Sequence, residues 1–348
     1  MKEGIVYRTE GDFSYCGWPT AARDKDGTVY VAFSGNRIGH VCPFGKNLLV
    51  KSYDNGLSWT EPEIVNDSVL DDRDAGFLVR ENGEKLLTWF NHSASFYMDQ
   101  YSEVQRTVKK ERLHLADKRI NEWKQMDKSL LEGGSYVKSL NTGKVEKVPV
   151  TSPHGPIELK SGELLYVGKE FHWGELEKGA IYACIYDGTW RVISKIEMPV
   201  PLNLVHEPHV IELCEGTYLA AFRVHNETSF TVYLSYSYDF GKSWTTPAPT
   251  GINGSPPHFM RCSTGEIVLS YARREKPFSE RAMISYDNGK TFENEIVLST
   301  SENIDIGYPS TVELDDGSLL TVYYQRYGDD ENTSVLYTKW RLEDAKNI

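Results

Sequence analysis

The octapeptide Ser-Tyr-Asp-Asn-Gly-Leu-Ser-Trp at residues 52–59 returns twice more in the chain. The later copies are Ser-Tyr-Asp-Phe-Gly-Lys-Ser-Trp at 237–244 and Ser-Tyr-Asp-Asn-Gly-Lys-Thr-Phe at 285–292. A degenerate fourth copy reads Tyr-Asp-Gly-Thr-Trp at 186–190. The aspartate can accept hydrogen bonds from the backbone N–H groups of a tight turn, and the glycine tolerates a positive φ. We expect each copy to form a hairpin turn that its last aromatic residue covers.

Six longer segments share a second pattern of strand, glycine-containing turn and strand. Each begins at an anchor residue nine positions before its glycine, and the glycines are Gly27, Gly83, Gly162, Gly216, Gly265 and Gly317. Successive glycines are 56, 79, 54, 49 and 52 residues apart, which suits four-stranded blades, and six blades suit one closed ring. The sequence therefore predicts an all-β, six-bladed β-propeller with four antiparallel strands per blade, formed by residues 1–348 as one domain.

The repeated octapeptides fall after the second strand of a repeat, so we place them on the outer hairpins of the blades. The interval of 79 residues contains an insertion of about 94–150 in the second blade. Its charged stretch 103–127 could form a helix, and we expect an elaborated outer hairpin or a helix at the rim rather than a second domain. The segment Gly4–Arg8 is expected to close the ring by pairing with the last blade.

The composition excludes several classes of function. A net charge of −12 argues against nucleic acid and against an anionic membrane surface as partners, and no apolar run reaches the length of a membrane span. Five scattered cysteines without a C-x-x-C pair predict neither a disulfide framework nor a zinc site, and we expect no cofactor. The N-terminus lacks the hydrophobic core of a signal peptide, so we expect a cytoplasmic protein, or a secreted or periplasmic one if the chain was trimmed.

The anchors identify a candidate site, because the first strands of a propeller line its axis and start at one face. The six anchors are Trp18, Asp74, Pro153, Glu207, Pro256 and Tyr308. The second strands end at the same face and bring Asn36-Arg37, Asn91-His92, Lys169-Glu170, Arg223, Arg273-Arg274 and Gln325-Arg326. Two carboxylates, a tyrosine and several arginines at equivalent positions indicate a functional face rather than a solvated one.

With its repeated Asp-box turns, the chain resembles the sialidase (neuraminidase) superfamily over nearly its whole length. The resemblance implies that Glu207, in His-Glu-Pro-His, activates Tyr308, in Gly-Tyr-Pro-Ser, as a nucleophile. A free phenol has a pKa of about 10 and needs such a base. Arg223 matches one arginine of the family's carboxylate-binding triad, and Arg274 or Arg273 matches another. Arginine forks bind a sugar carboxylate through two hydrogen bonds.

Two positions depart from the sialidase pattern. The family's first arginine precedes an Ile-Pro pair, but this chain has Gly17-Trp18-Pro19 there, and Arg37 or Arg73 would have to replace it. The family's acid/base aspartate lies in a loop that here reads 38–47 without a carboxylate. His40 in that loop, or Asp74 from the second blade, is therefore the candidate general acid.

The histidines and Trp18 complete the predicted site. His154 starts a central strand and is expected to line the pocket with Trp18, as substrate-binding residues. His209 and His258 occupy equivalent positions one step inside their anchors, so we expect them to pack in the channel. No histidine spacing is diagnostic of a metal site.

Three functions fit these residues. The first is an exo-acting glycoside hydrolase that removes a terminal, acidic sugar from a glycan. The second is a polysaccharide or uronate lyase on the same scaffold, because such enzymes also use Tyr or His with arginines around a carboxylate. The third is a propeller that binds glycans without catalysis. The carbohydrate partner is common to all three, and the sequence does not determine the oligomeric state.

Overall fold

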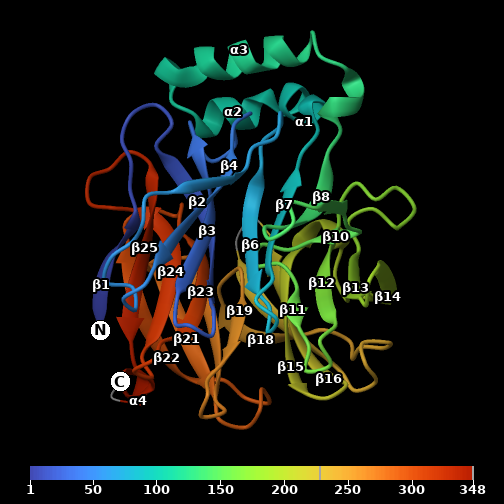
Figure 1. Cartoon of the computed structure of the whole chain (residues 1–348), viewed down its shortest axis with the longest axis vertical. Helices are drawn as coiled ribbons and strands as arrows, with labels where there is room; N and C mark the ends of the chain where they lie inside the picture. The colour runs from blue at the N-terminus through green and yellow to red at the C-terminus, as the bar shows by residue number, and fades with distance from the viewer. Residues whose placement is uncertain (227–228, 347–348) are drawn as a thin grey trace.

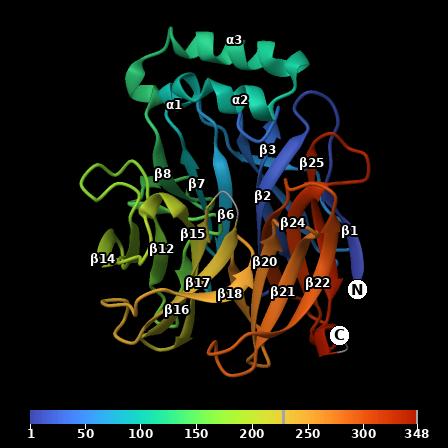
Figure 2. The same cartoon turned by 180° about the vertical axis from the view of Figure 1, so that it is seen from behind.

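Six antiparallel sheets stand as blades around a common axis in the computed structural model, which describes residues 1–226 and 229–346 (Figure 1, Figure 2). The fold is the six-bladed β-propeller that the repeat spacing predicts. The first three blades contain β2 (Tyr15–Arg23), β3 (Val29–Arg37), β4 (Lys46–Ser52) and β5 (Glu63–Asn66); β6 (Arg73–Val79), β7 (Lys85–Asn91), β8 (Gly134–Ser139) and β9 (Val145–Lys147); and β10 (Val150–Thr151), β11 (Ile157–Glu158), β12 (Leu164–Glu170), β13 (Ile181–Tyr186) and β14 (Trp190–Ile196).

The other three blades follow in chain order. They contain β15 (Val205–Cys214), β16 (Thr217–His225), β17 (Phe230–Ser237) and β18 (Ala248–Asn253); β19 (His258–Arg261), β20 (Ile267–Arg273), β21 (Phe278–Ser285) and β22 (Glu293–Ser301); and β23 (Gly307–Glu313), β24 (Leu319–Arg326) and β25 (Thr333–Trp340). The last blade takes its fourth strand, β1 (Lys2–Tyr7), from the N-terminus, where Gly4 pairs with Tyr337 of β25. This pairing closes the ring as predicted.

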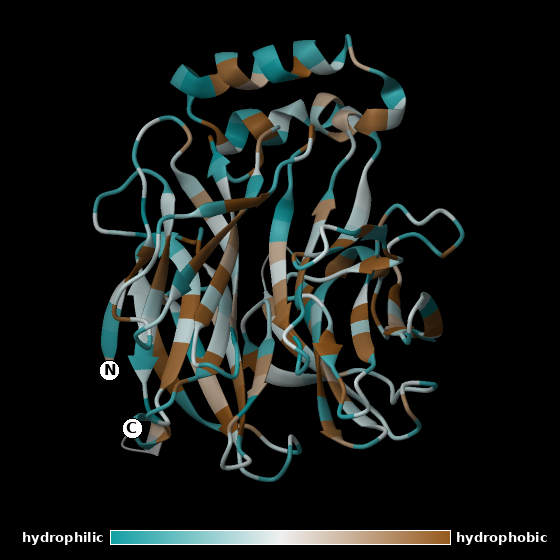
Figure 3. Cartoon of the chain, viewed as in Figure 1, coloured by the Kyte–Doolittle hydropathy of each residue, from teal (hydrophilic) through white to brown (hydrophobic). Residues whose placement is uncertain are grey.

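The second strands are apolar on both faces because each lies between two other blades. In β3, Val29, Val31 and Phe33 pack in one cluster with residues of the last blade. The alternate residues Tyr30 and Ala32 pack with residues of the second blade. The strands accordingly carry brown bands in Figure 3, whereas the connecting loops are mostly white or teal. Burial of both faces between neighbouring blades stabilises the ring.

The repeated octapeptides form the predicted turns between the third and fourth strands of their blades. In the first copy, the Ser52 hydroxyl accepts from the Gly56 N–H at 2.8 Å, and the Asp54 carboxylate accepts from the N–H groups of Leu57 and Ser58 at 3.0 and 2.9 Å. The copy at 285–292 repeats these bonds, and the copy at 237–244 repeats the serine bond and the second aspartate bond. The final Trp59 packs on the core of the neighbouring strands.

The insertion in the second blade is helical and lies between β7 and β8. It contains α1 (Ala94–Asp99), α2 (Tyr101–Thr107), η1 (Lys110–Arg112), α3 (Leu113–Trp123) and η2 (Lys128–Leu131), and the remaining elements are η3 (Leu202–Leu204) and α4 (Leu342–Lys346). The predicted helix at 103–127 is broken near Val108, which forms a β-bridge with Gly39 of the first blade. The predicted range 94–150 extends too far, because residues 134–147 are the blade's own outer strands.

The helices stand over the end of the ring where β3 and β7 finish (Figure 1). Buried Tyr97, Val104, Ile120 and Trp123 pack there with apolar residues of the first two blades. The Trp123 indole also donates to the Val69 carbonyl at 2.9 Å. The insertion is thus fixed to the same face that collects the anchor residues. Within the described residues, no helix has the length and apolar character to cross a membrane.

Candidate active site

Four of the six anchors share one backbone distortion. Trp18, Asp74, Glu207 and Tyr308 have φ values of 56°, 52°, 48° and 56°, in the left-handed region that residues other than glycine rarely adopt. In each blade the pairing between first and second strands shifts its register across the anchor. A β-bulge re-aims a side chain, and strained φ/ψ values of this kind cluster at functional sites. The repeated distortion therefore marks these four positions as one site.

Glu207 and Tyr308 are joined by a hydrogen bond, although 101 residues separate them in the chain. The Tyr308 hydroxyl donates to Oε1 of Glu207, and the Arg223 guanidinium donates to Oε2 at 2.6 Å. The Arg223 Nε–H is directed to Nδ1 of His225 at 3.2 Å. Burial, together with the negative charges of Glu207 and Asp74, raises the pKa of Tyr308 well above its ordinary value. The phenol is thus protonated and points its proton at a carboxylate, the arrangement required to activate it.

Asp74 and Glu207 are two carboxyl groups with opposite pKa shifts. Burial and the nearby charge of Glu207 raise the pKa of Asp74 to about 7. Burial also opposes ionisation of Glu207, but Arg223 and the Tyr308 hydrogen bond outweigh it and lower that pKa to about 2. A pair separated in this way supplies a proton donor and a charged acceptor at one pH. Asp74 can therefore donate a proton near neutrality while Glu207 stays ionised.

Arg274 extends the site toward the last blade. Its guanidinium carbon lies 5.6 Å from the centre of the Tyr308 ring, and its NH2 group donates to the Tyr324 hydroxyl at 3.3 Å. Its Nε atom is buried and has no hydrogen-bond partner within the described part of the chain. Tyr308 thus meets Arg274 directly and Arg223 through Glu207. Arg273, the alternative to Arg274, is half-buried and also has a buried Nε atom without a partner in the described residues.

The first and second blades arrange their charges differently. Arg37 is 0% exposed and binds both carboxylate oxygens of Asp71, and Tyr97 donates to the same carboxylate at 2.5 Å. The Trp18 indole covers the guanidinium groups of Arg37 and Arg73, whose central carbons lie 4.7 and 4.3 Å from its ring centre. The expectation that Arg37 and Trp18 contact substrate is therefore corrected, since both are almost wholly buried. Arg73 keeps a small exposed part and donates to the His40 carbonyl at 3.0 Å.

His40 belongs to a network that includes three residues which the sequence reading missed. Its Nδ1 atom lies 2.9 Å from Asp305 and 2.7 Å from the Tyr15 hydroxyl, and Tyr324 also donates to Asp305 at 3.2 Å. The His40 side chain is 30% exposed, and no hydrogen bond engages its Nε2 atom among the described residues. Loss of hydration lowers the pKa of His40 more than Asp305 raises it, so the ring is neutral near pH 7.

A regular offset could have revealed these partners. Tyr15, Asp71 and Asp305 each stand three positions before an anchor, namely Trp18, Asp74 and Tyr308. Because the bulge turns the anchor toward the axis, the residue three positions earlier lies where the chain enters the blade. It can then meet the end of the neighbouring second strand, as Asp71 meets Arg37.

His154 lies inside the channel rather than on the pocket surface, which corrects its expected role. It is buried, and its ring centre lies 4.7 Å from that of His258 and 5.7 Å from that of His209. His154 meets the Thr20 hydroxyl at 3.0 Å, and His209 accepts from the Phe259 N–H at 3.0 Å. Burial lowers the pKa of all three histidines. They pack the channel, and no group of acids, cysteines or histidines in the described residues has the arrangement of a metal site.

Comparisons with known proteins identify the family of the chain and its fold. Residues 135–321 match the family model described as a BNR repeat-like domain, which spans more than half of the chain. The chain belongs to the BNR repeat-like domain family. A search of the curated proteins finds no match.

Solved structures place this BNR repeat-like protein beside sialidases in fold. A protein of unknown function from Dyadobacter fermentans is 22% identical, with a TM-score of 0.73 and 97% of each chain covered. The NanB sialidase from Streptococcus pneumoniae is 12% identical, with a TM-score of 0.68 and coverage of 98% of this chain and 71% of that one. The leech intramolecular trans-sialidase is 11% identical, with a TM-score of 0.69 and coverage of 100% and 71%. At these identities the likeness shows a sialidase-like fold.

Proposed function

We propose that this protein is an exo-acting glycoside hydrolase that removes a terminal acidic sugar from a glycan. The observation that carries the proposal is the hydrogen bond from Tyr308 to Glu207, with Arg223 on the other carboxylate oxygen. A neutral phenol approaches an anionic sugar without charge repulsion, and the carboxylate takes its proton as the oxygen attacks the anomeric carbon.

Asp74 is the proposed general acid. Its carboxyl group is partly protonated at neutral pH because its pKa is raised to about 7. It would protonate the glycosidic oxygen as the bond to the leaving group breaks, and it would then accept a proton from the water that releases the sugar from Tyr308. His40 is the alternative acid, but its lowered pKa leaves it mostly neutral at pH 7.

Three arginines would bind the sugar carboxylate. Arg274 lies over the Tyr308 ring, Arg223 binds the Glu207 partner of Tyr308, and Arg73 lies over the Trp18 ring. A substrate carboxylate that shares Arg223 would weaken the ion pair of this arginine with Glu207. The pKa of Glu207 would then rise, which makes this carboxylate a better base for Tyr308 when substrate is bound.

The proposal is tested with a panel of aryl glycosides of acidic sugars and with natural acidic glycans. We expect release of the free terminal sugar by the wild-type protein and loss of release in the Glu207→Gln variant. Absence of any release across the panel, or equal release by wild type and variant, would contradict the proposal.

A uronate lyase is the second candidate, and the Tyr15–His40–Asp305 network favours it. A lyase needs a base to remove the proton beside the carboxylate, after which the C–O bond breaks and a carbon–carbon double bond forms. His40, fixed through Nδ1 by Asp305, has its Nε2 atom available for that proton. Uronic-acid oligosaccharides then separate the candidates: a lyase product absorbs ultraviolet light and takes no oxygen from isotopically labelled water, whereas a hydrolase product takes up one labelled oxygen.

A further inference from the structure

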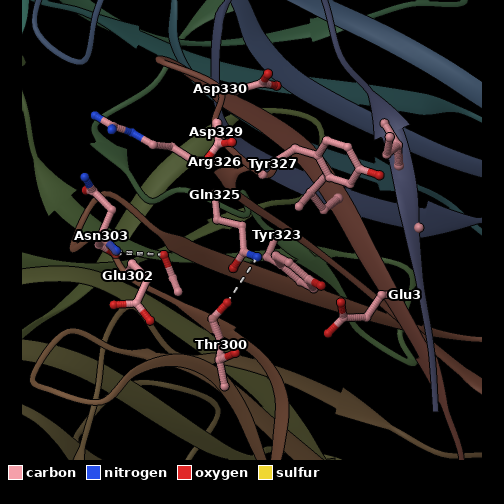
Figure 4. A pocket seen from close by; sticks show the side chains of 15 residues that line it. Glu3, Thr300, Glu302, Asn303, Tyr323, Gln325, Arg326, Tyr327, Asp329 and Asp330 are labelled. Atoms are coloured by element: carbon pink, nitrogen blue, oxygen red, sulfur yellow. Dashed lines mark hydrogen bonds between the residues drawn. The ribbon is translucent and has the colours of Figure 1, made fainter.

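A cavity of about 970 Å³ is lined by none of the residues assigned to the central site. It is a groove at the outer edge of the last two blades, bounded by β1, the end of β22 and the end of β24 (Figure 4). Its lining includes neither Glu207 nor Tyr308, which stand on first strands beside the axis. Its volume is at the upper end of the range for small-molecule sites, about 300–1,000 Å³.

Polar groups without charge form the inner part of this groove. Gln325, Asn303 and Thr300 supply two amides and a hydroxyl, and Figure 4 shows the Gln325 amide between Asn303 and Tyr323, whose own hydroxyl is buried against Thr338. Planar amides and hydroxyls match the alternating donors and acceptors of sugar hydroxyl groups.

Gln325 has a hydrogen-bonding group that the protein does not satisfy. Its side chain is 7% exposed, and its Nε2 group donates to the Ser299 hydroxyl at 3.1 Å. Its Oε1 atom is buried and has no hydrogen-bond partner in the described residues. Either orientation of the amide leaves one end without a partner, and a buried polar group in that state is unfavourable. A ligand that carries both donors and acceptors would satisfy it.

The outer part of the groove selects against anions. Glu3, Glu302 and Asp329 are exposed there, whereas among the cations Arg326 is exposed and Arg8, at the mouth, is paired with Asp330. Carboxylates accept hydrogen bonds from sugar hydroxyls but repel carboxylate or sulfate groups.

Tyr327 adds an aromatic surface at the mouth of the groove. The ring is 47% exposed, and the Arg8 guanidinium lies over it with its carbon 5.7 Å from the ring centre. Arg8 is itself held by Asp330 at 2.6 and 2.8 Å, so the ring is supported on that side. An exposed, supported ring can stack on the apolar C–H face of a pyranose.

From these features we propose that the groove is a second carbohydrate site, for a neutral oligosaccharide. It is separate in place and in charge from the central site, whose arginines suit an acidic sugar. The groove contacts its ligand through Gln325 and Asn303 inside and through Tyr327 and Glu302 at the mouth. Its occupancy does not depend on chemistry at Tyr308.

The test is binding of neutral probes to the full-length protein, measured by calorimetry and by saturation-transfer NMR. The probes are lactose, N-acetyllactosamine, cellotriose and xylotriose, with digalacturonate as the charged comparison. We expect at least one neutral probe to bind and digalacturonate to be excluded from the groove. Tyr327→Ala and Glu302→Ala, both exposed positions, should each weaken binding of that probe at least tenfold.

Two matched variants control for effects elsewhere. Tyr53→Ala removes an exposed tyrosine from an outer turn, and Tyr308→Phe disables the central site; both should bind the neutral probe as wild type does. Failure of every neutral probe to bind overturns the proposal, as does binding that survives Tyr327→Ala and Glu302→Ala. Loss of neutral-probe binding in Tyr308→Phe would also overturn it, because the ligand would then occupy the central site. An inactive protein that still binds the probe in the groove would contradict only the proposed hydrolase.

Discussion

The candidate site has two halves, and the same β-bulge at an anchor residue has a different consequence in each half. In the fourth and sixth blades, bulges at Glu207 and Tyr308 bring together a carboxylate and a phenol, with Arg223 beside them. In the first blade the same bulge lays the Trp18 indole over Arg37, and Arg37 is neutralised by Asp71. One half holds groups that can act on a substrate, and the other half buries its charge.

The comparison shows that the strained backbone at an anchor fixes where its side chain lies. The type of side chain then determines whether that position can react with a substrate or instead covers a buried charge. Trp18 follows Gly17, which stands where the sialidase pattern has an arginine. The ring centres of Trp18 and Tyr308 are 6.3 Å apart, so the indole forms a wall directly beside the proposed nucleophile. We expect the reacting half to determine the chemistry and the Trp18 half to stabilise the site.

Replacement of Tyr308 by Phe should have the largest effect and most directly tests the reacting half. Loss of the nucleophilic oxygen should lower kcat by roughly 10⁴-fold or more, with the fold retained. The measurement is release of aryl alcohol from the best substrate of the panel, with circular dichroism as the check on folding. Full activity in Tyr308→Phe would remove Tyr308 from the mechanism.

Asp74→Asn should lower kcat/KM by about 10²–10⁴-fold, the usual contribution of a general acid. The wild-type rate should also fall as pH rises above about 7, because the carboxyl group that donates the proton then ionises. This alkaline decline should vanish in Asp74→Asn. If it persists there but disappears in a His40→Gln variant, the acid is His40 and the first blade contributes to the chemistry after all.

Arg37→Met tests the buried half, where we expect a change in stability instead of binding. Removal of the arginine leaves the Asp71 carboxylate buried with Tyr97 and Arg73 as its remaining partners. Breaking a buried ion pair costs about 3–5 kcal/mol. The free energy of unfolding in urea should fall by that amount.

Arg326→Met is the matched control, because Arg326 also ends a second strand but is exposed. Its free energy of unfolding should change by at most about 0.5 kcal/mol. If Arg37→Met kept full stability and instead raised KM, Arg37 would be a substrate ligand and the two halves of the site would be alike.

The repeats made the fold predictable, since turn chemistry and strand length depend on local sequence. The octapeptides and the six glycines predicted the number and order of the blades, and the segment Gly4–Arg8 predicted the closure of the ring. The insertion was harder, because residues 103–127 carry charges suited to one helix. The chain instead breaks near Val108, where the pairing with Gly39 is a contact between distant residues.

The sequence could predict which residues meet in the site, because strand register alone determines that. It could not predict which of them are buried, because that depends on packing. Equivalent positions brought Asp74, Glu207 and Tyr308 together as expected. Burial of Arg37 depends on Asp71 and on the covering indole, and neither follows from the strand pattern. Asp305 was missed because it lies in a linker, although its offset from Tyr308 matches that of Asp71 from Asp74.

Asp54→Ala should have the smallest effect, and it contrasts the outer repeats with the strained anchors. Bonds from the Ser58 hydroxyl and the Ser58 and Leu57 N–H groups lower the pKa of Asp54 to about 2. Because the side chain is only partly buried, its loss should cost about 1 kcal/mol of unfolding free energy.

Stabilisation by Asp54 is present above the ordinary aspartate pKa of about 4 and is lost as pH falls toward 2, so the difference from wild type should shrink in acid. Asp26→Ala, at another exposed turn, should change the unfolding free energy by at most about 0.5 kcal/mol. Both variants should keep wild-type kcat/KM, since the outer turns hold the blades while the proposed catalytic groups stand on the anchors. A loss of activity in Asp54→Ala at unchanged stability would show that the outer turns also shape the site.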